Sequence, residues 1–150
     1  MNGGGTKLTI PLVGTWALLS MSYVDRDGHE IAPWGLLPLG RITYTADGRF
    51  SAVLAAPDRE MTKPSGSAPI EAQAAAFRKS LGYAGRYELA GDVMFHYVDV
   101  ATDPTWQDTV QERLVRYDGR ILTLATQPIV TKRDPGGHVL TLTWEKIASP

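Results

Sequence analysis

The sequence predicts an all-β protein, a single closed up-and-down antiparallel barrel of about eight strands with one short helix near the cavity entrance. Most segments alternate apolar and polar residues with a period of two, which is typical of strands that bury one face. Asp-Gly pairs separate several of these segments, and such pairs mark tight hairpins. Closing the sheet into a barrel would leave no strand edge exposed.

The alternating segments predict strands, in chain order, at residues 14–24, 41–44, 49–55, 84–89, 92–100, 109–117, 121–126 and 139–147. Turns are expected at Asp27-Gly28, Asp47-Gly48, Asp118-Gly119 and the Asp-Pro-Gly-Gly run at 134–137. Glycine suits these turns because it accepts a positive φ without steric cost.

One segment, residues 70–81, is rich in helix-forming residues and predicts a helix that could act as a lid or plug. Its apolar side chains recur at helical spacing, at Ile70, Ala74, Phe77 and Leu81. Residues 56–68, just before it, are polar and contain proline, so they are expected to form a loop.

Composition bounds the class of protein. The chain has 150 residues, which suits one domain, and we expect residues 1–150 to form it, with a flexible end at 1–6. Its 15 Lys and Arg against 16 Asp and Glu leave a formal charge of −1, which argues against nucleic acid as a partner. The absence of cysteine excludes a disulfide scaffold, a thiolate zinc site and a cysteine nucleophile.

Location and cofactors are likewise constrained. No export signal and no long apolar run is present, so we expect a cytoplasmic protein, a monomer or homodimer, that has no membrane partner. The three histidines are scattered, so no metal and no cofactor is expected. Asp25 to Gly28 is expected to form a turn rather than a calcium loop. His29 and His138 lie beside turns and are expected to be solvated.

Alternation also predicts which side chains face inward. A turn at Ala90-Gly91 would place Gly85 opposite His96 and leave open space beside the imidazole. The inward face of this hairpin would hold Tyr83, Gly85, Tyr87, Met94, His96, Val98 and Val100. This face carries no formal charge when His96 is neutral, which is why we assign it to the interior.

Two further hairpins complete the predicted interior. A three-residue loop at 46–48 pairs Tyr44 with Phe50, and a turn at Asp118-Gly119 pairs Val115 with Leu122. The second hairpin turns inward Gln111, Arg113, Val115, Tyr117, Leu122 and Leu124. A packed core seldom accepts a buried arginine, because an unpaired charge there is costly. A mostly apolar interior with a few polar groups therefore predicts a ligand cavity.

Several short motifs, in order, carry a resemblance to a known family. They are Gly14-Thr15-Trp16, residues 40–48, 83–87, 96–99, Pro104-Thr105-Trp106, residues 111–113 and Trp144-Glu145-Lys146. Over almost its whole length the chain resembles the lipocalin-like domain family of bacterial and fungal proteins. The resemblance implies a calycin-type barrel whose cavity takes small hydrophobic or amphipathic molecules, in carriers and in enzymes that cyclise, isomerise or decarboxylate a ligand. It also implies that Lys146 packs against Trp16. Where the family has a glycine soon after Pro-x-Trp, this chain has Gln107-Asp108.

The leading function predicted is binding of a small hydrophobic or aromatic molecule inside the barrel. The expected ligand-binding residues are Tyr44, Tyr83, Met94, Val98, Trp106, Gln111 and Leu124. The alternative is a cofactor-independent isomerase, cyclase or lyase acting on a natural-product-like carbonyl compound. There His96 would shuttle a proton, Tyr87 and Tyr83 would polarise an oxygen, and Arg113 would stabilise an anionic form.

Each of these residues also has a structural interpretation. His96 could be a core histidine, Arg113 could pair with a buried acid or lie at the rim, and Trp106 could cap the core. A third hypothesis is therefore an interaction module whose barrel is filled by its own side chains.

Overall fold

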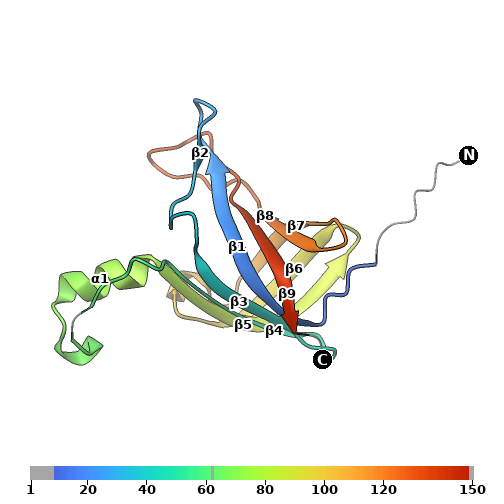
Figure 1. Ribbon diagram of the computed structural model, residues 1–150, viewed down its shortest axis with the longest axis horizontal. Coiled ribbons are helices and arrows are strands. Elements are labelled where there is room, and N and C mark those ends of the chain that lie inside the picture. Colours follow the sequence, from blue (N-terminus) through green and yellow to red (C-terminus); the bar gives the residue numbers. More distant parts are fainter. Residues whose placement is uncertain (1–8, 62, 149–150) are drawn as a thin grey trace, which may run out of the picture.

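The computed structural model describes residues 9–61 and 63–148 (Figure 1). The predicted flexible end at 1–6 lies outside these ranges. The strands are β1 (Gly14–Val24), β2 (Glu30–Ile31), β3 (Leu39–Tyr44), β4 (Arg49–Ala55), β5 (Ser80–Ala90), β6 (Val93–Ala101), β7 (Val110–Tyr117), β8 (Ile121–Thr126) and β9 (Thr141–Ala148). The helices are α1 (Ile70–Arg78) and two short 3₁₀ helices, η1 (Ser65–Ser67) and η2 (Pro104–Trp106).

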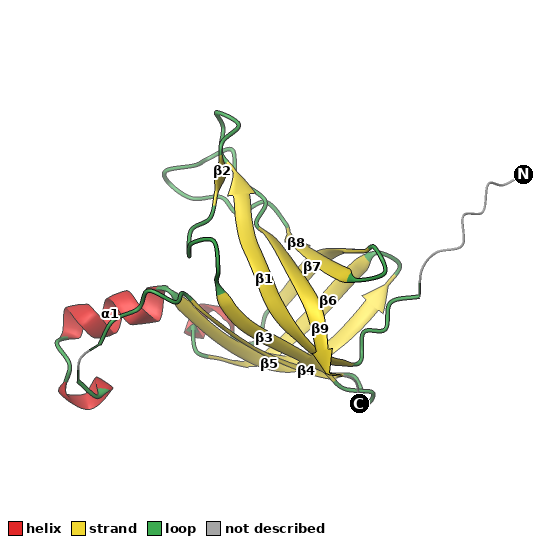
Figure 2. Cartoon of the chain, viewed as in Figure 1, coloured by secondary structure: helices red, strands yellow, loops and turns green. Residues whose placement is uncertain are grey.

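The strands form a closed antiparallel barrel (Figure 2). Eight of them pair in the order β1-β3-β4-β5-β6-β7-β8-β9, and β9 pairs with β1 to close the ring; the two-residue β2 pairs only with the far end of β1. The predicted up-and-down barrel with one short helix is therefore confirmed. Within the described ranges, no helix is long and apolar enough to span a bilayer.

The largest boundary differences lie where α1 ends and β5 begins. The sequence predicts a helix to residue 81, but the helix ends at Arg78 and β5 begins at Ser80. Ser80 pairs with Ala55, and Leu81 with Leu54, so pairing with β4 takes these residues into the sheet. Sheet formation here overrides the local helix propensity, which is a weaker preference.

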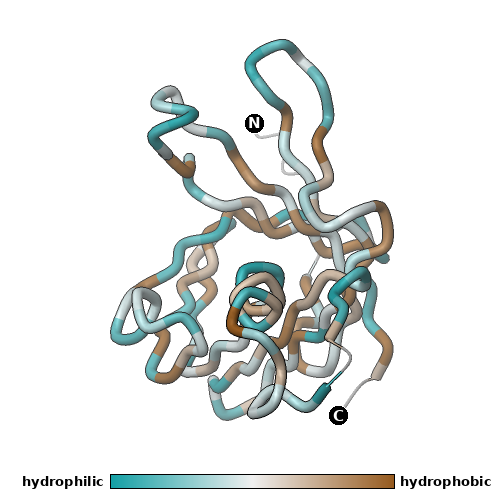
Figure 3. Tube along the Cα trace, turned by 90° about the vertical axis from the view of Figure 1, so that its left-hand side faces the viewer, coloured by the Kyte–Doolittle hydropathy of each residue, from teal (hydrophilic) through white to brown (hydrophobic). Residues whose placement is uncertain are grey.

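The apolar stripe of α1 does not pack on the barrel as a plug would. Ile70 is 79% exposed and Phe77 is 47% exposed. The helix extends outward from the ends of β4 and β5 (Figure 1) and is seen nearly end-on in Figure 3. Figure 3 also shows hydrophilic tips on the two loops above the barrel, which join β1 to β2 and β8 to β9. The helix therefore flanks the entrance, where Arg78 lies on the cavity wall.

Strand registers differ from expectation in two of the three hairpins analysed. The β3–β4 register, with Tyr44 opposite Phe50, is confirmed. The β5–β6 and β7–β8 registers are each shifted by two residues, so that Tyr87 lies opposite His96 and Val115 opposite Leu124. A shift of two keeps side chains on their predicted faces wherever the register is regular, because the period of a strand is two.

A bulge in β6 explains the one residue of this hairpin that faces the wrong way. Gly85 pairs with Val98, but the preceding Ala84 pairs with Val100, so Asp99 is an extra residue. The extra residue reverses the alternation, and Val100 is 55% exposed rather than interior. A Cβ on Gly85 would overlap the main-chain carbonyl oxygen of Tyr97. The glycine thus permits close backbone approach at the bulge and does not leave space beside the imidazole.

The end of the barrel that carries the tight hairpins is filled by side chains. Trp16 is fully buried, its indole nitrogen donates to the Leu12 carbonyl at 2.9 Å, and the Lys146 ammonium lies 5.3 Å from its ring centroid. The contact implied for Lys146 is therefore present. Other side chains in this core include Ile42, Tyr44, Met94 and Leu122, each at most 1% exposed. Side chains therefore close this end of the barrel.

Candidate functional site

A cavity of about 430 Å³ opens at the other end of the barrel. Its lining residues come from the ends of the strands that meet there and from the connections between them. They are Met21, Pro33, Trp34, Leu54, Arg78, Ser80, Leu81, Tyr83, Asp103, Trp106, Gln111, Arg113, Leu124, Thr126, Ile129, Leu140, Leu142 and Trp144. The volume lies in the range of pockets for small organic ligands, roughly 300–1,000 Å³.

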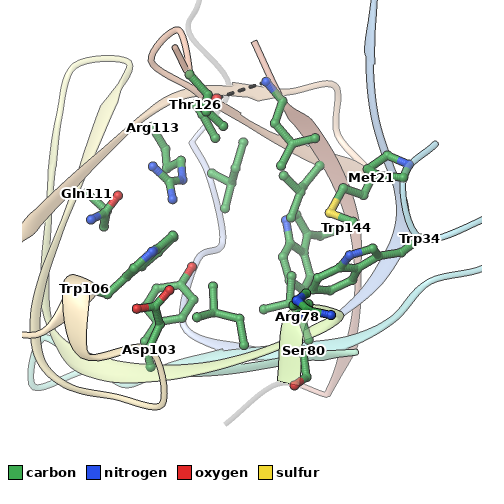
Figure 4. A pocket seen from close by; sticks show the side chains of 18 residues that line it. Met21, Trp34, Arg78, Ser80, Asp103, Trp106, Gln111, Arg113, Thr126 and Trp144 are labelled. Carbon is green, nitrogen blue, oxygen red and sulfur yellow. Dashed lines mark hydrogen bonds between the residues drawn. The ribbon is translucent and has the colours of Figure 1, made fainter. Parts of the chain in front are cut away.

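Two walls of different character face each other across the cavity (Figure 4). Arg113, Gln111, Trp106 and Asp103 lie on one side, whereas Trp144, Trp34 and Met21 lie on the other. The leucines of β8 and β9 add further apolar surface. An aromatic and aliphatic pocket with a few polar groups on one wall is the usual composition of a small-molecule site.

Arg113 provides the buried charge of the cavity. It is 8% exposed, and alternation along β7 directs it inward between Gln111 and Val115. Its Nη1 donates to the main-chain carbonyl of Glu112 at 2.9 Å. Among the described residues, no carboxylate oxygen lies within 4 Å of its guanidinium. The predicted pairing with a buried acid is thus not present in this part of the chain.

Trp106 and Tyr83 form an aromatic corner beside this guanidinium. The two ring centroids are 5.1 Å apart, and the Arg113 Cζ lies 5.8 Å from the Trp106 ring. Burial raises the pKa of Tyr83, and the positive charge of Arg113 partly offsets that increase. The phenol therefore remains protonated near neutral pH and can donate a hydrogen bond.

The loop that carries Trp106 is held by Asp103 and by an unusual backbone. Asp103 Oδ1 accepts from the Thr105 main-chain N–H at 2.9 Å, which caps η2. Asp108 has φ of 60°, the left-handed conformation, and is the only non-glycine among the described residues with a positive φ. This is the neighbourhood in which the resemblance described above leads us to expect a glycine. The loop therefore has the left-handed backbone conformation that glycine adopts most readily, and aspartate is one of the few other residues that adopt it at modest cost.

His96 lies below the cavity, inside the filled half of the barrel. It has no exposed surface, its Nε2 is 2.8 Å from the Tyr44 hydroxyl, and the Phe50 ring is 4.4 Å away between centroids. Desolvation, with a smaller contribution from Arg113, lowers its pKa to about 3. Its Nδ1 has no hydrogen-bond partner among the described residues. The imidazole is neutral near pH 7 and lines no part of the cavity.

The remaining predicted site residues divide between the two halves of the barrel. Tyr83, Trp106, Gln111 and Leu124 line the cavity together with Arg113. Those that do not line it are Tyr44, Tyr87, Met94 and Val98. Tyr87 instead donates its hydroxyl to the Thr45 carbonyl at 2.8 Å. The catalytic grouping of His96, Tyr87 and Arg113 stays a prediction, and only Arg113 of the three reaches the cavity.

Sequence reasoning missed much of the opposite wall. Leu142 and Trp144 have the inward parity of β9, so alternation along that strand was a usable signal. Trp34 and Ile129 lie in loops, and Arg78 lies at the end of α1. No periodicity predicts which loop side chains fold over a barrel mouth, because tertiary contacts decide it.

Among the described residues, one group of side chains lies close enough together to hold a metal ion. It is in the turn after β1 and consists of Asp25, Asp27 and His29. Asp25 Oδ1 accepts main-chain N–H bonds from Asp27 and His29, each at 2.9 Å, which holds the expected turn. His138 differs from expectation, because its ring is half-buried and lies against that of Tyr23, with centroids 4.2 Å apart and planes tilted by 30°.

Comparison with known proteins identifies the family. The sequence model of the Lipocalin-like domain matches residues 13–147. A lipocalin-like protein from Bacteroides uniformis ATCC 8492 is 15% identical with a TM-score of 0.48, covering 92% of this chain and 100% of that chain. An uncharacterized protein from Bacteroides eggerthii DSM 20697 is 14% identical with a TM-score of 0.44, covering 91% and 99%. No curated protein matches the chain. Because the family model spans most of its length, the chain belongs to the lipocalin-like domain family.

Proposed function

We propose that this protein binds a small, largely hydrophobic or aromatic molecule inside the barrel. The observation that carries the proposal is the 430 Å³ cavity at the open end of the barrel, whose lining is mainly aromatic and aliphatic. Burying an apolar ligand there would gain about 25 cal/mol for each Å² removed from water. Membership of the lipocalin-like domain family is consistent with this use of the barrel.

The division of the barrel into a filled half and a hollow half also supports binding. Trp16, Tyr44 and Met94 pack the closed half, so the fold does not need the open half for its core. A module filled by its own side chains would leave no such volume. Trp144 lies at the junction, since it is 1% exposed and yet lines the cavity.

A neutral fluorescent probe tests the proposal directly. N-phenyl-1-naphthylamine fluoresces more strongly in apolar surroundings, so titration with the protein is expected to give saturable binding at one site. Leu142→Trp places an indole in the cavity, where it occupies space that the probe needs, and is expected to weaken probe binding by about tenfold or more, or about 1.4 kcal/mol.

The matched control is Leu114→Trp. Leu114 lies on the outer face of β7 and is 39% exposed, so the same change there should leave probe affinity unaltered. Equal loss in both variants would mean that the probe binds elsewhere on the surface. Absence of saturable binding to the wild type would refute the proposal for this class of ligand.

Native mass spectrometry of the purified protein then looks for the natural ligand. A bound molecule adds its mass to the folded protein and is released on denaturation for small-molecule analysis. A compound that is lost in Leu142→Trp but retained in Leu114→Trp would be assigned to the cavity.

A further inference from the structure

We propose that the ligand is an amphipathic molecule that carries a carboxylate, and that Arg113 binds this carboxylate inside the cavity. The inference rests on the proposed function and adds the chemical class of the ligand. It starts from an imbalance of charge on one wall of the cavity.

The positive charge in question is that of the Arg113 guanidinium. Arg113 is 8% exposed, and the contact to the Glu112 carbonyl occupies one of its five N–H donors. No carboxylate of the described residues lies within 4 Å to neutralise it. A buried charge without a counter-ion is costly, and folded proteins usually pair it. An anionic ligand would complete this pair.

The other charged groups at the cavity leave the excess of positive charge in place. Arg78 lines the entrance and is exposed, and Asp103 is the one carboxylate in the lining. Asp103 Oδ1 accepts from both the main-chain N–H and the hydroxyl of Thr105, so that oxygen is already used in the cap of η2. His96 adds no charge, because its pKa lies at about 3. The lining therefore carries two arginines against one aspartate.

The neighbours of Arg113 favour a planar acid. Trp106 lies 5.8 Å from the guanidinium carbon and 5.1 Å from the Tyr83 ring, so a flat ring next to a carboxylate would meet an aromatic surface. Gln111, on the same strand, donates one amide hydrogen to Thr109 Oγ1 at 2.9 Å and keeps a second for the ligand. The planar fork of arginine matches the two oxygens of a carboxylate.

The test compares two ligands that share one ring system. 2-Naphthoate carries the carboxylate, and 2-naphthamide replaces it with a neutral amide of nearly the same shape. Each is titrated against wild-type protein loaded with N-phenyl-1-naphthylamine at pH 7, and displacement of the probe gives its Kd. We expect naphthoate to bind about tenfold or more tightly than naphthamide, which is the usual gain from a charge-assisted hydrogen bond.

Variants at two arginines of β7 locate the effect. Arg113→Met is expected to abolish the preference for naphthoate over naphthamide, because the charge-assisted contact is lost. Arg116→Gln, on the outer face of the same strand, is expected to keep the preference. Thermal unfolding without ligand gives a further readout: Arg113→Met should melt no lower than wild type, because it removes an unpaired buried charge.

The outcomes separate the two proposals. Probe binding with equal affinity for naphthoate and naphthamide would overturn the carboxylate assignment and leave the proposed function standing. Failure of the wild type to bind the probe, the acid and the amide would overturn both. A preference for naphthoate that survives in Arg113→Met would overturn the role given to Arg113.

Discussion

Replacing His96 should remove a specific part of the acid sensitivity of this protein. The imidazole has no exposed surface, and burial lowers its pKa from 6.5 to about 3. An unfolded chain binds the proton near pH 6.5, whereas the folded chain excludes it. The contribution of His96 is therefore complete above pH 6.5 and is lost as pH falls toward 3.

The size of the effect follows from those two pKa values. One pKa unit corresponds to about 1.4 kcal/mol, so wild type should lose about 2 kcal/mol of unfolding free energy at pH 5 through this residue alone. At pH 4 the loss should reach about 3 kcal/mol. For a domain of this length, the pH 5 loss corresponds to a fall of roughly 4–8 °C in Tm.

Urea denaturation of wild type and His96→Gln at pH 7.5, 6, 5 and 4 measures this contribution. The variant starts from a lower stability at pH 7.5, because the packing against Phe50 changes. Its stability should nevertheless fall less steeply between pH 7.5 and 5, by about 2 kcal/mol. Carboxylates titrate alike in both proteins, so they cancel in the comparison. His29→Gln serves as the control, since the His29 side chain is 74% exposed.

Two results would refute this reasoning. Parallel pH profiles for wild type and His96→Gln would mean that His96 titrates equally in the folded and unfolded states. A flatter profile in His29→Gln would mean that an exposed histidine carries the effect.

Three further changes test the fold and the site. Gly85→Ala should lower stability by about 2 kcal/mol or more in urea denaturation, because the new Cβ meets the Tyr97 carbonyl; the exposed Gly66→Ala should not, and equal effects would contradict the bulge argument. Asp108→Gly should raise the free energy of unfolding by up to about 1 kcal/mol, and with it the Tm, because glycine adopts a positive φ without strain. A lower Tm would show that contacts of the aspartate side chain stabilise the loop by more than the strain costs. Tyr44→Phe removes the hydrogen bond to the buried imidazole and should cost about 1–3 kcal/mol in urea denaturation, so an unchanged midpoint would count against that bond.

Alternation predicted faces well and registers less well. The inward placement of Tyr83, Met94 and His96 agrees with the structure, although the pairing across their hairpin is shifted by two residues. The turn lies at Gly91-Asp92 rather than at Ala90-Gly91, and Gly91 has φ of 64°. Either choice satisfies the same pattern of buried and exposed residues, because a shift of two conserves parity. The bulge at Asp99 is the one place in this hairpin where alternation predicts the wrong face. An inserted residue reverses the alternation, and the pattern of apolar and polar residues does not show where the insertion lies.

The sequence by itself determined the fold class, the inward faces of the strands and the presence of a buried arginine, because these properties depend on the spacing of apolar residues and turns along the chain. The tertiary structure decided which half of the barrel is hollow. Tyr44 and Leu124 both face inward, yet one is packed in the closed half and the other lines the cavity. That distinction depends on depth along the barrel and on how side chains from distant strands fill space together. The loop residue Trp34 reaches the cavity for the same reason, through a chain path that no local pattern encodes.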